Sequence, residues 1–193
     1  ALASADILVD FLDSLPAIDA VALGGSIRRG KDMVHDVDII AASNEIEFVL
    51  EIFSKHPHIK EIISTTENRV EAVTWLGVKT DLTMVDKEDF IAVLHWSTGS
   101  KKYFQGLVSF GKKKGIQLTE KQVILEGSPV PVEEEGDIYR LLELPFIPPE
   151  IREDTRVIEM AGEGMLPSLI ELEDIKGDLH IHSAWSDGID TIE

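Results

Sequence analysis

Two carboxylates one residue apart lie in the apolar segment DVDII, as Asp36 and Asp38. The segment predicts a β-strand, in which alternate side chains share a face, so both carboxylates point the same way. Carboxylates on one face can hold a hard divalent cation, and Mg²⁺ fills its remaining positions with water and substrate phosphate oxygens. Asp81, in the strand-like segment KTDLTMVD, would complete a site for two metals about 3.5–4 Å apart.

A glycine-rich turn, GGSIRRG, precedes this strand and contains Gly25 and Ser26. It opens a short predicted helix over residues 26–31, whose free N–H groups and positive dipole end favour phosphate. The Ser26 hydroxyl and the guanidinium of Arg28 or Arg29 would add charge-assisted hydrogen bonds. Each feature alone is as typical of an ordinary turn or a solvated strand. Their order along the chain predicts a site for a nucleoside triphosphate with its metals.

Composition sets the outer limits of the interpretation. The 193 residues are 44% hydrophobic and 28% charged, which is typical of a chain with a buried core, and the formal net charge is −18. That charge argues against nucleic-acid binding, except at a basic segment over residues 99–115 without acidic residues. Its lysines are Lys101, Lys102, Lys112, Lys113 and Lys114. The chain has no cysteine and no apolar run long enough to span a bilayer, so we expect a cytoplasmic protein without membrane contact.

The elements that must position these groups follow from the hydrophobic periodicity. Residues 1–15 predict an amphipathic helix, and a short buried strand leads into the glycine turn. After DVDII we expect a helix near residues 43–56 and three β-rich segments, the last two joined by a hairpin at Gly77. Helices dominate from residue 87, with one or two strands within 115–132 and a helix over 133–144. The fold class is therefore α+β.

The chain resembles the nucleotidyltransferase superfamily and, more narrowly, a prokaryotic family X DNA polymerase (polymerase beta-like) with a C-terminal PHP domain. The motifs that carry the resemblance are GGSIRRGKDMVHDVDII, KTDLTMVD, WSTGSKKYFQGL and GDLHIHSAWSDG. The resemblance implies a nucleotidyltransferase palm, a mixed sheet flanked by helices, followed by a small α+β thumb. It divides the chain into a palm over 1–86, a thumb over 87–150, a linker over 151–177 and the start of a truncated PHP domain over 178–193. We therefore expect a fragment of a longer protein.

Site residues carry over from the family by position. The resemblance makes Asp36, Asp38 and Asp81 the ligands of two Mg²⁺ or Mn²⁺ ions, with Asp81 also activating the primer 3′-hydroxyl. The other implied sites are the triphosphate site (Gly25, Ser26, Arg28, Arg29), the nucleotide sugar and base site (Trp96, Thr98, Gly99), the DNA-facing surface (Lys101, Lys102, Lys112, Lys113, Lys114) and an incomplete PHP metal site (His180, His182, Asp187). That last site would take Zn²⁺ or Mn²⁺ only in an intact PHP domain.

The resemblance implies a monomeric, repair-type DNA-directed DNA polymerase that extends primer-template or gapped DNA with dNTPs. The thumb departs from the family pattern at three positions. Ser97 follows Trp96 where the family has a second aromatic residue, and Phe104 and Val108 stand where it commonly has Asn and Arg. Two alternatives therefore stay open. One is a template-independent or small-molecule nucleotidyltransferase; the other is a degenerate DNA-binding scaffold for the PHP phosphoesterase domain.

Overall fold

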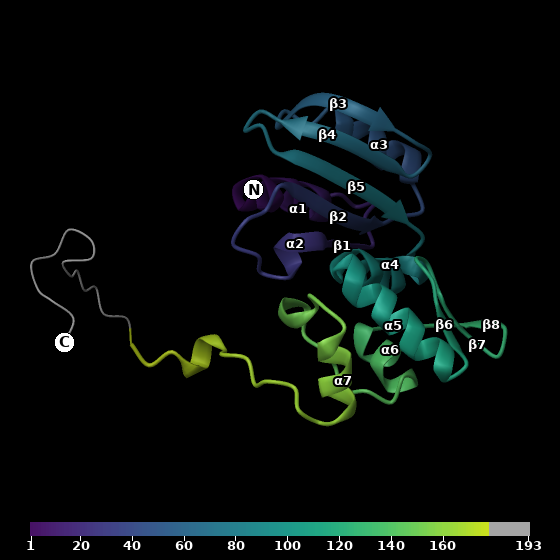
Figure 1. Ribbon diagram of the computed structural model, residues 1–193. Helices are drawn as coiled ribbons and strands as arrows, with labels where there is room; N and C mark the ends of the chain where they lie inside the picture. The colour runs from purple at the N-terminus through teal and green to yellow at the C-terminus, as the bar shows by residue number, and fades with distance from the viewer. Residues whose placement is uncertain (178–193) are drawn as a thin grey trace, which may run out of the picture.

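The computed structural model describes residues 1–177. Two units lie side by side in Figure 1, one built on a five-stranded sheet and one mainly helical with a three-stranded sheet. The expected PHP strand and the expected ligands His180, His182 and Asp187 lie outside the described residues. None of the helices in residues 1–177 is long and apolar enough to cross a membrane.

The first unit contains a mixed sheet in the order β1-β2-β5-β4-β3. Neighbouring strands pair antiparallel except β2 and β5, which run parallel. The elements are α1 (Leu2–Asp13), β1 (Ala20–Leu23), α2 (Gly25–Arg28), β2 (Asp36–Ala42), α3 (Ile46–Ser54), β3 (Ile59–Thr65), β4 (Arg69–Thr74) and β5 (Lys79–Val85). The expected hairpin is confirmed, since β4 and β5 pair antiparallel and Gly77 adopts a φ of 74° between them. Glycine reaches this left-handed region without strain.

One face of this sheet is covered by α1 and α3, and the other carries the carboxylates. Val37 and Ile39 point into the core with Leu8 of α1 and Phe53 of α3. Because the side-chain period of a strand is two, burying these residues turns the intervening positions of β2 to the opposite face. The hydrophobic core therefore fixes where Asp36 and Asp38 point.

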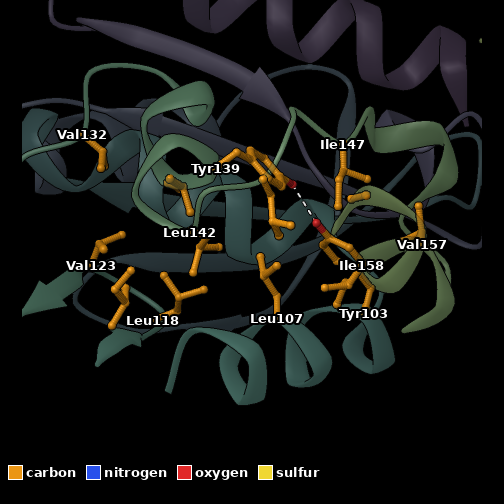
Figure 2. Packing of buried hydrophobic residues seen from close by; sticks show 14 of the residues in the cluster. Tyr103, Leu107, Leu118, Val123, Val132, Tyr139, Leu142, Ile147, Val157 and Ile158 are labelled. Carbon is orange, nitrogen blue, oxygen red and sulfur yellow. Dashed lines mark hydrogen bonds between the residues drawn. The ribbon is translucent and has the colours of Figure 1, made fainter. Parts of the chain in front are cut away.

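The second unit contains η1 (Lys87–Asp89), α4 (Phe90–Thr98), α5 (Lys101–Lys113), β6 (Ile116–Leu118), β7 (Val123–Leu125), β8 (Ser128–Val130), α6 (Glu135–Leu141), η2 (Pro149–Ile151), α7 (Arg156–Gly162) and η3 (Leu172–Asp174). Figure 2 shows its core, in which Leu107 of α5, Leu118 of β6 and Leu142 after α6 pack together. Helix α4 also packs through Val93 and Leu94 against β2, so it covers the part of the sheet face beyond the carboxylates.

The first part of the expected linker over 151–177, residues 151–162, packs against the second unit. Val157 and Ile158 of α7 are buried in the core of the second unit, where Figure 2 shows them beside Tyr103. The prolines before it start the 3-10 turn η2, with Pro149 in its first turn, a position that suits a residue without an N–H group. A helix of seven residues offers too few apolar positions for a periodic signal. After α7 the described chain runs away from both units in Figure 1.

Replacing Ile158 with alanine tests whether α7 belongs to this core. The side chain is 4% exposed, and its loss leaves a cavity between α5 and α7. We expect the free energy of unfolding to fall by about 2–5 kcal/mol in a denaturant titration. Ile170→Ala is the matched control, because Ile170 is 83% exposed, and it should stay within about 0.5 kcal/mol of the unchanged chain. Equal stability of the two variants would contradict the packing of α7.

Candidate active site at the palm carboxylates

The three aspartates are brought together by the one parallel pair of strands in the large sheet. In the register of β2 and β5, Asp38 lies opposite Asp81, and Asp36 lies opposite Lys79. Neighbouring strands are about 4.7–4.9 Å apart, so the carboxylates share a small area of one sheet face. Asp36 is exposed, whereas Asp38 and Asp81 are half-buried. The predicted convergence of these residues is thus present in the backbone register.

Asp38 carries the electrostatic cost of this arrangement. Burial, followed by the negative charges of Asp36 and Asp81, raises its pKa from 3.8 to about 6, and the positive charges of Arg69 and Arg29 limit the rise. A divalent cation would relieve both causes, because it replaces lost hydration and neutralises the crowded charge. The donor set is made of hard oxygen ligands and fits Mg²⁺ or Mn²⁺.

Gly25 ties the glycine turn to Asp38. It has a φ of 55°, and a Cβ built on it would lie 1.8 Å from Asp38 Oδ2. Any side chain would displace the carboxylate, so only glycine allows the turn to approach it. The Gly24 N–H also donates to the Asp38 carbonyl at 2.8 Å. The predicted helix is the single turn α2, so individual N–H groups rather than a long helix dipole would contact a phosphate.

The two arginines of the turn are paired with groups of the second unit. Arg28 donates to Thr98 Oγ1 at 2.7 Å and to Glu135 Oε2 at 2.6 Å. Arg29 donates to the Thr98 carbonyl at 2.8 Å and to Glu153 Oε1 at 2.9 Å. Both guanidinium groups therefore fasten the turn to the end of α4 and to acidic residues far along the chain.

Glu135 accepts from two arginines, one in each unit. Its second partner is Arg152, whose Nη1 lies 2.7 Å from Glu135 Oε1. Burial alone would raise the pKa of Glu135, but hydrogen bonds and charge from Arg28 and Arg152 outweigh it and lower the pKa to about 2. Arg152 is fully buried, lies over the rings of Tyr139 and Phe146, and donates from Nε to the Ile147 carbonyl at 2.8 Å.

A second polar chain continues from this ion bridge into the core of the second unit. His95 Nε2 lies 3.1 Å from the Tyr139 hydroxyl, which lies 2.7 Å from the Tyr103 hydroxyl, the pair joined by the dashed line in Figure 2. Burial, followed by the positive charge of Arg152, lowers the pKa of His95 to about 3, so the imidazole is neutral at physiological pH. Sequence reasoning missed Glu135, Arg152 and Tyr139, because their partners are distant along the chain.

The predicted sugar and base site has mixed roles. Trp96 is 39% exposed and stands edge-on to Phe104, with ring centroids 6.4 Å apart. Thr98 is buried and its hydroxyl donates to the Leu94 carbonyl at 2.6 Å. A Cβ at Gly99 would lie 2.8 Å from the Tyr103 ring, so this glycine is required by packing. Of the predicted residues here, Trp96 is the one with an exposed side chain.

The predicted basic surface divides into two places. Lys101 and Lys102 are exposed at the start of α5, whereas Lys112, Lys113 and Lys114 are exposed at its end. At a rise of about 1.5 Å per residue, the helix separates the groups by roughly 15 Å. Lys114 is also paired with Glu143. The lysines of this segment therefore do not form one continuous basic patch.

No three His, Asp or Glu side chains within residues 1–177 are grouped as a ready metal site. Both side-chain oxygens of Asp81 accept hydrogen bonds from Arg69. The carboxylates therefore fit a divalent cation in type and strand register, and the Asp81 side chain must leave Arg69 to take part.

The fold and the site together define a class: a polymerase beta-like palm, with its carboxylates on adjoining strands, followed by a thumb. Residues 92–153 match the family described as DNA polymerase beta thumb. The chain is 36% identical over 168 residues to the DNA polymerase/3′-5′ exonuclease PolX of Bacillus subtilis (strain 168), covering 85% of this chain and 29% of that protein. The chain is thus similar to a family X DNA polymerase along most of its own length, and it spans less than a third of the length of this relative.

Neutralising Asp38 should stabilise the protein in the absence of metal. Its pKa in the folded state, about 6, is above the ordinary value of 3.8. The folded protein therefore loses stability as the pH rises from about 4 to 6, because Asp38 must ionise in an unfavourable environment. In EDTA at pH 7.5, Asp38→Asn should therefore raise the free energy of unfolding by about 1 kcal/mol after allowance for solvent screening. The gain should vanish near pH 4. Asp6→Asn, at an exposed position of α1, is the matched control and should leave the free energy of unfolding within about 0.5 kcal/mol of the unchanged chain.

Glu135→Gln tests the ion bridge between the units. Glutamine keeps the shape but removes the charge between Arg28 and Arg152, and leaves the buried guanidinium uncompensated. We expect a loss of about 3–5 kcal/mol in the free energy of unfolding at pH 7. Because the pKa of Glu135 is lowered, its contribution is complete above about pH 4.5 and is lost as the pH falls towards 2. Glu143→Gln removes an exposed pair with Lys114 and should leave the free energy of unfolding nearly unchanged.

Proposed function

We propose that this chain is the palm and thumb of a DNA-directed DNA polymerase, which transfers a deoxynucleotide from a dNTP to a primer 3′-hydroxyl. The observation that carries the proposal is the register of Asp38 opposite Asp81 on parallel strands, beside the glycine turn. The relative named as a DNA polymerase supports the same reaction. The partners would be dNTPs and primer-template or gapped DNA, as expected for repair synthesis.

In this proposal the primer oxygen attacks the α-phosphorus, the bond to the pyrophosphate oxygen breaks, and pyrophosphate leaves. Asp36, Asp38 and Asp81 would hold two Mg²⁺ or Mn²⁺ ions. These ions would lower the pKa of the primer 3′-hydroxyl and neutralise the negative charge of the leaving pyrophosphate. Asp81 would receive the hydroxyl proton, and the N–H groups at Gly25 and Ser26 would hold the triphosphate.

The second unit would position the nucleotide and the duplex. Trp96 is exposed near the end of α4 and would contact the sugar or base, while Thr98 holds Arg28 and Arg29 in place. Lys101 and Lys102 lie at the start of α5, two residues after Gly99, and are suited to DNA phosphate.

A template-independent or small-molecule nucleotidyltransferase is the second candidate, and one observation favours it. Phe104 and Val108 pack against the core of the second unit instead of presenting hydrogen-bonding groups to a base. Direct readout of a base edge needs polar groups, so these two positions would contribute none. The intact carboxylates speak against the third candidate, a degenerate binding scaffold.

Primer extension on single-nucleotide-gapped DNA separates these candidates. With Mg²⁺ and each dNTP in turn, we expect the added base to follow the template, and we expect Asp81→Asn to lower the incorporation rate at least about 100-fold because a metal ligand and proton acceptor is lost. Asp86→Asn, at an exposed position just after β5, is the matched control and should keep the rate. Addition that ignores the template would support the second candidate, and full activity of Asp81→Asn would refute the catalytic assignment.

A further inference from the structure

Arg69 lies on β4 between two carboxylates of the palm face. Its Nε lies 2.7 Å from Asp81 Oδ1 and 2.9 Å from Oδ2, and its Nη2 also binds Oδ2. The same Nη2 lies 3.1 Å from Glu71 Oε1. Glu71 is the cross-strand neighbour of Asp81 in the register of β4 and β5. The guanidinium is thus shared between a candidate metal ligand and an acidic residue with no role in the proposed chemistry.

The charge on this face explains why a cation is needed there. Asp36, Asp38, Asp81 and Glu71 all project from the same side of three adjacent strands. With these groups ionised, their repulsion requires a nearby positive charge. Arg69 supplies this positive charge, and its planar guanidinium can bind both oxygens of one carboxylate.

The same bidentate contact keeps a metal ion away from Asp81. Mg²⁺ binds carboxylate oxygens at about 2.0–2.1 Å and tolerates little distortion of its octahedral shell. A guanidinium that occupies both oxygens of Asp81 repels the cation and blocks its approach. Arg69 is 49% exposed, so the side chain has room to move, and Glu71 is already in contact with it.

We propose that Arg69 is a built-in counter-ion that competes with divalent metal for Asp81, and that Glu71 receives the guanidinium when metal binds. The inference rests on the proposed function, because it takes Asp81 as a metal ligand. Arg69 is a positioning residue here, because it acts through Asp81 and sets when that carboxylate is available. The arrangement keeps the acidic face stable without metal and adds a cost to metal entry.

A titration of the whole chain with Mn²⁺, in the absence of nucleotide and DNA, tests this competition. Electron paramagnetic resonance measures the free Mn²⁺ and gives the affinity. Arg69→Gln should tighten Mn²⁺ binding about 10-fold, because the competing charge is gone. Glu71→Gln alone should weaken Mn²⁺ binding about threefold. In a chain that already carries Arg69→Gln it should have no effect, because Glu71 acts only by receiving Arg69. Arg156→Gln, which removes another exposed arginine paired with Asp154, is the matched control and should leave the affinity unchanged.

Unchanged or weaker Mn²⁺ binding by Arg69→Gln would overturn the inference, as would additive effects of the two substitutions. Asp81→Asn distinguishes this failure from that of the proposed function. If Asp81→Asn loses affinity while Arg69→Gln binds like the unchanged chain, Asp81 is a ligand and only the competition is refuted. If Asp81→Asn binds Mn²⁺ as well as the unchanged chain, the metal assignment fails and the inference fails with it.

Discussion

The carboxylate of Glu135, held between Arg28 and Arg152, is the contact on which the arrangement of the two units depends. Arg28 belongs to the turn beside the palm carboxylates, and Arg152 lies buried in the second unit against the ring of Tyr139. Burying such an ion pair costs free energy of desolvation, and removing one partner destabilises the fold even more, because it leaves an unpaired buried charge. The turn that would hold a triphosphate is therefore positioned by residues more than one hundred positions further along the chain.

The palm face shows how a very acidic chain concentrates part of its charge. Several negative groups share a small area of the large sheet, and the raised pKa of Asp38 reflects the cost of that concentration. Positive charge is supplied locally by side chains already engaged with protein carboxylates, among them Arg29 and Arg69. Net charge says little about such a site, because the interactions act over a few ångströms and are screened beyond about 10 Å.

Local patterns predicted the palm well and the contacts between units poorly. Alternation fixed the face of Asp36 and Asp38, and Gly77 marked the hairpin, because both depend on neighbouring residues. Helix α7 was missed since seven residues carry little periodicity, and the role of Glu135 was missed since its partners are set by tertiary packing. The lysines between 101 and 114 predicted one basic surface, but the length of α5 divides them. The domain limits and the metal ligands stay predictions.

The spacing of Asp38 and Asp81 is set by the hydrogen-bonded ladder of β2 and β5, whereas Trp96, Phe104 and Val108 depend on how helices α4 and α5 pack. Substitutions in the helices can accumulate without altering the ladder. The separation of the acidic pair is thus independent of the side chains that would contact a nucleotide. Under the proposed function, a change in those helices would alter the choice of nucleotide and leave the spacing of the proposed metal ligands as it is.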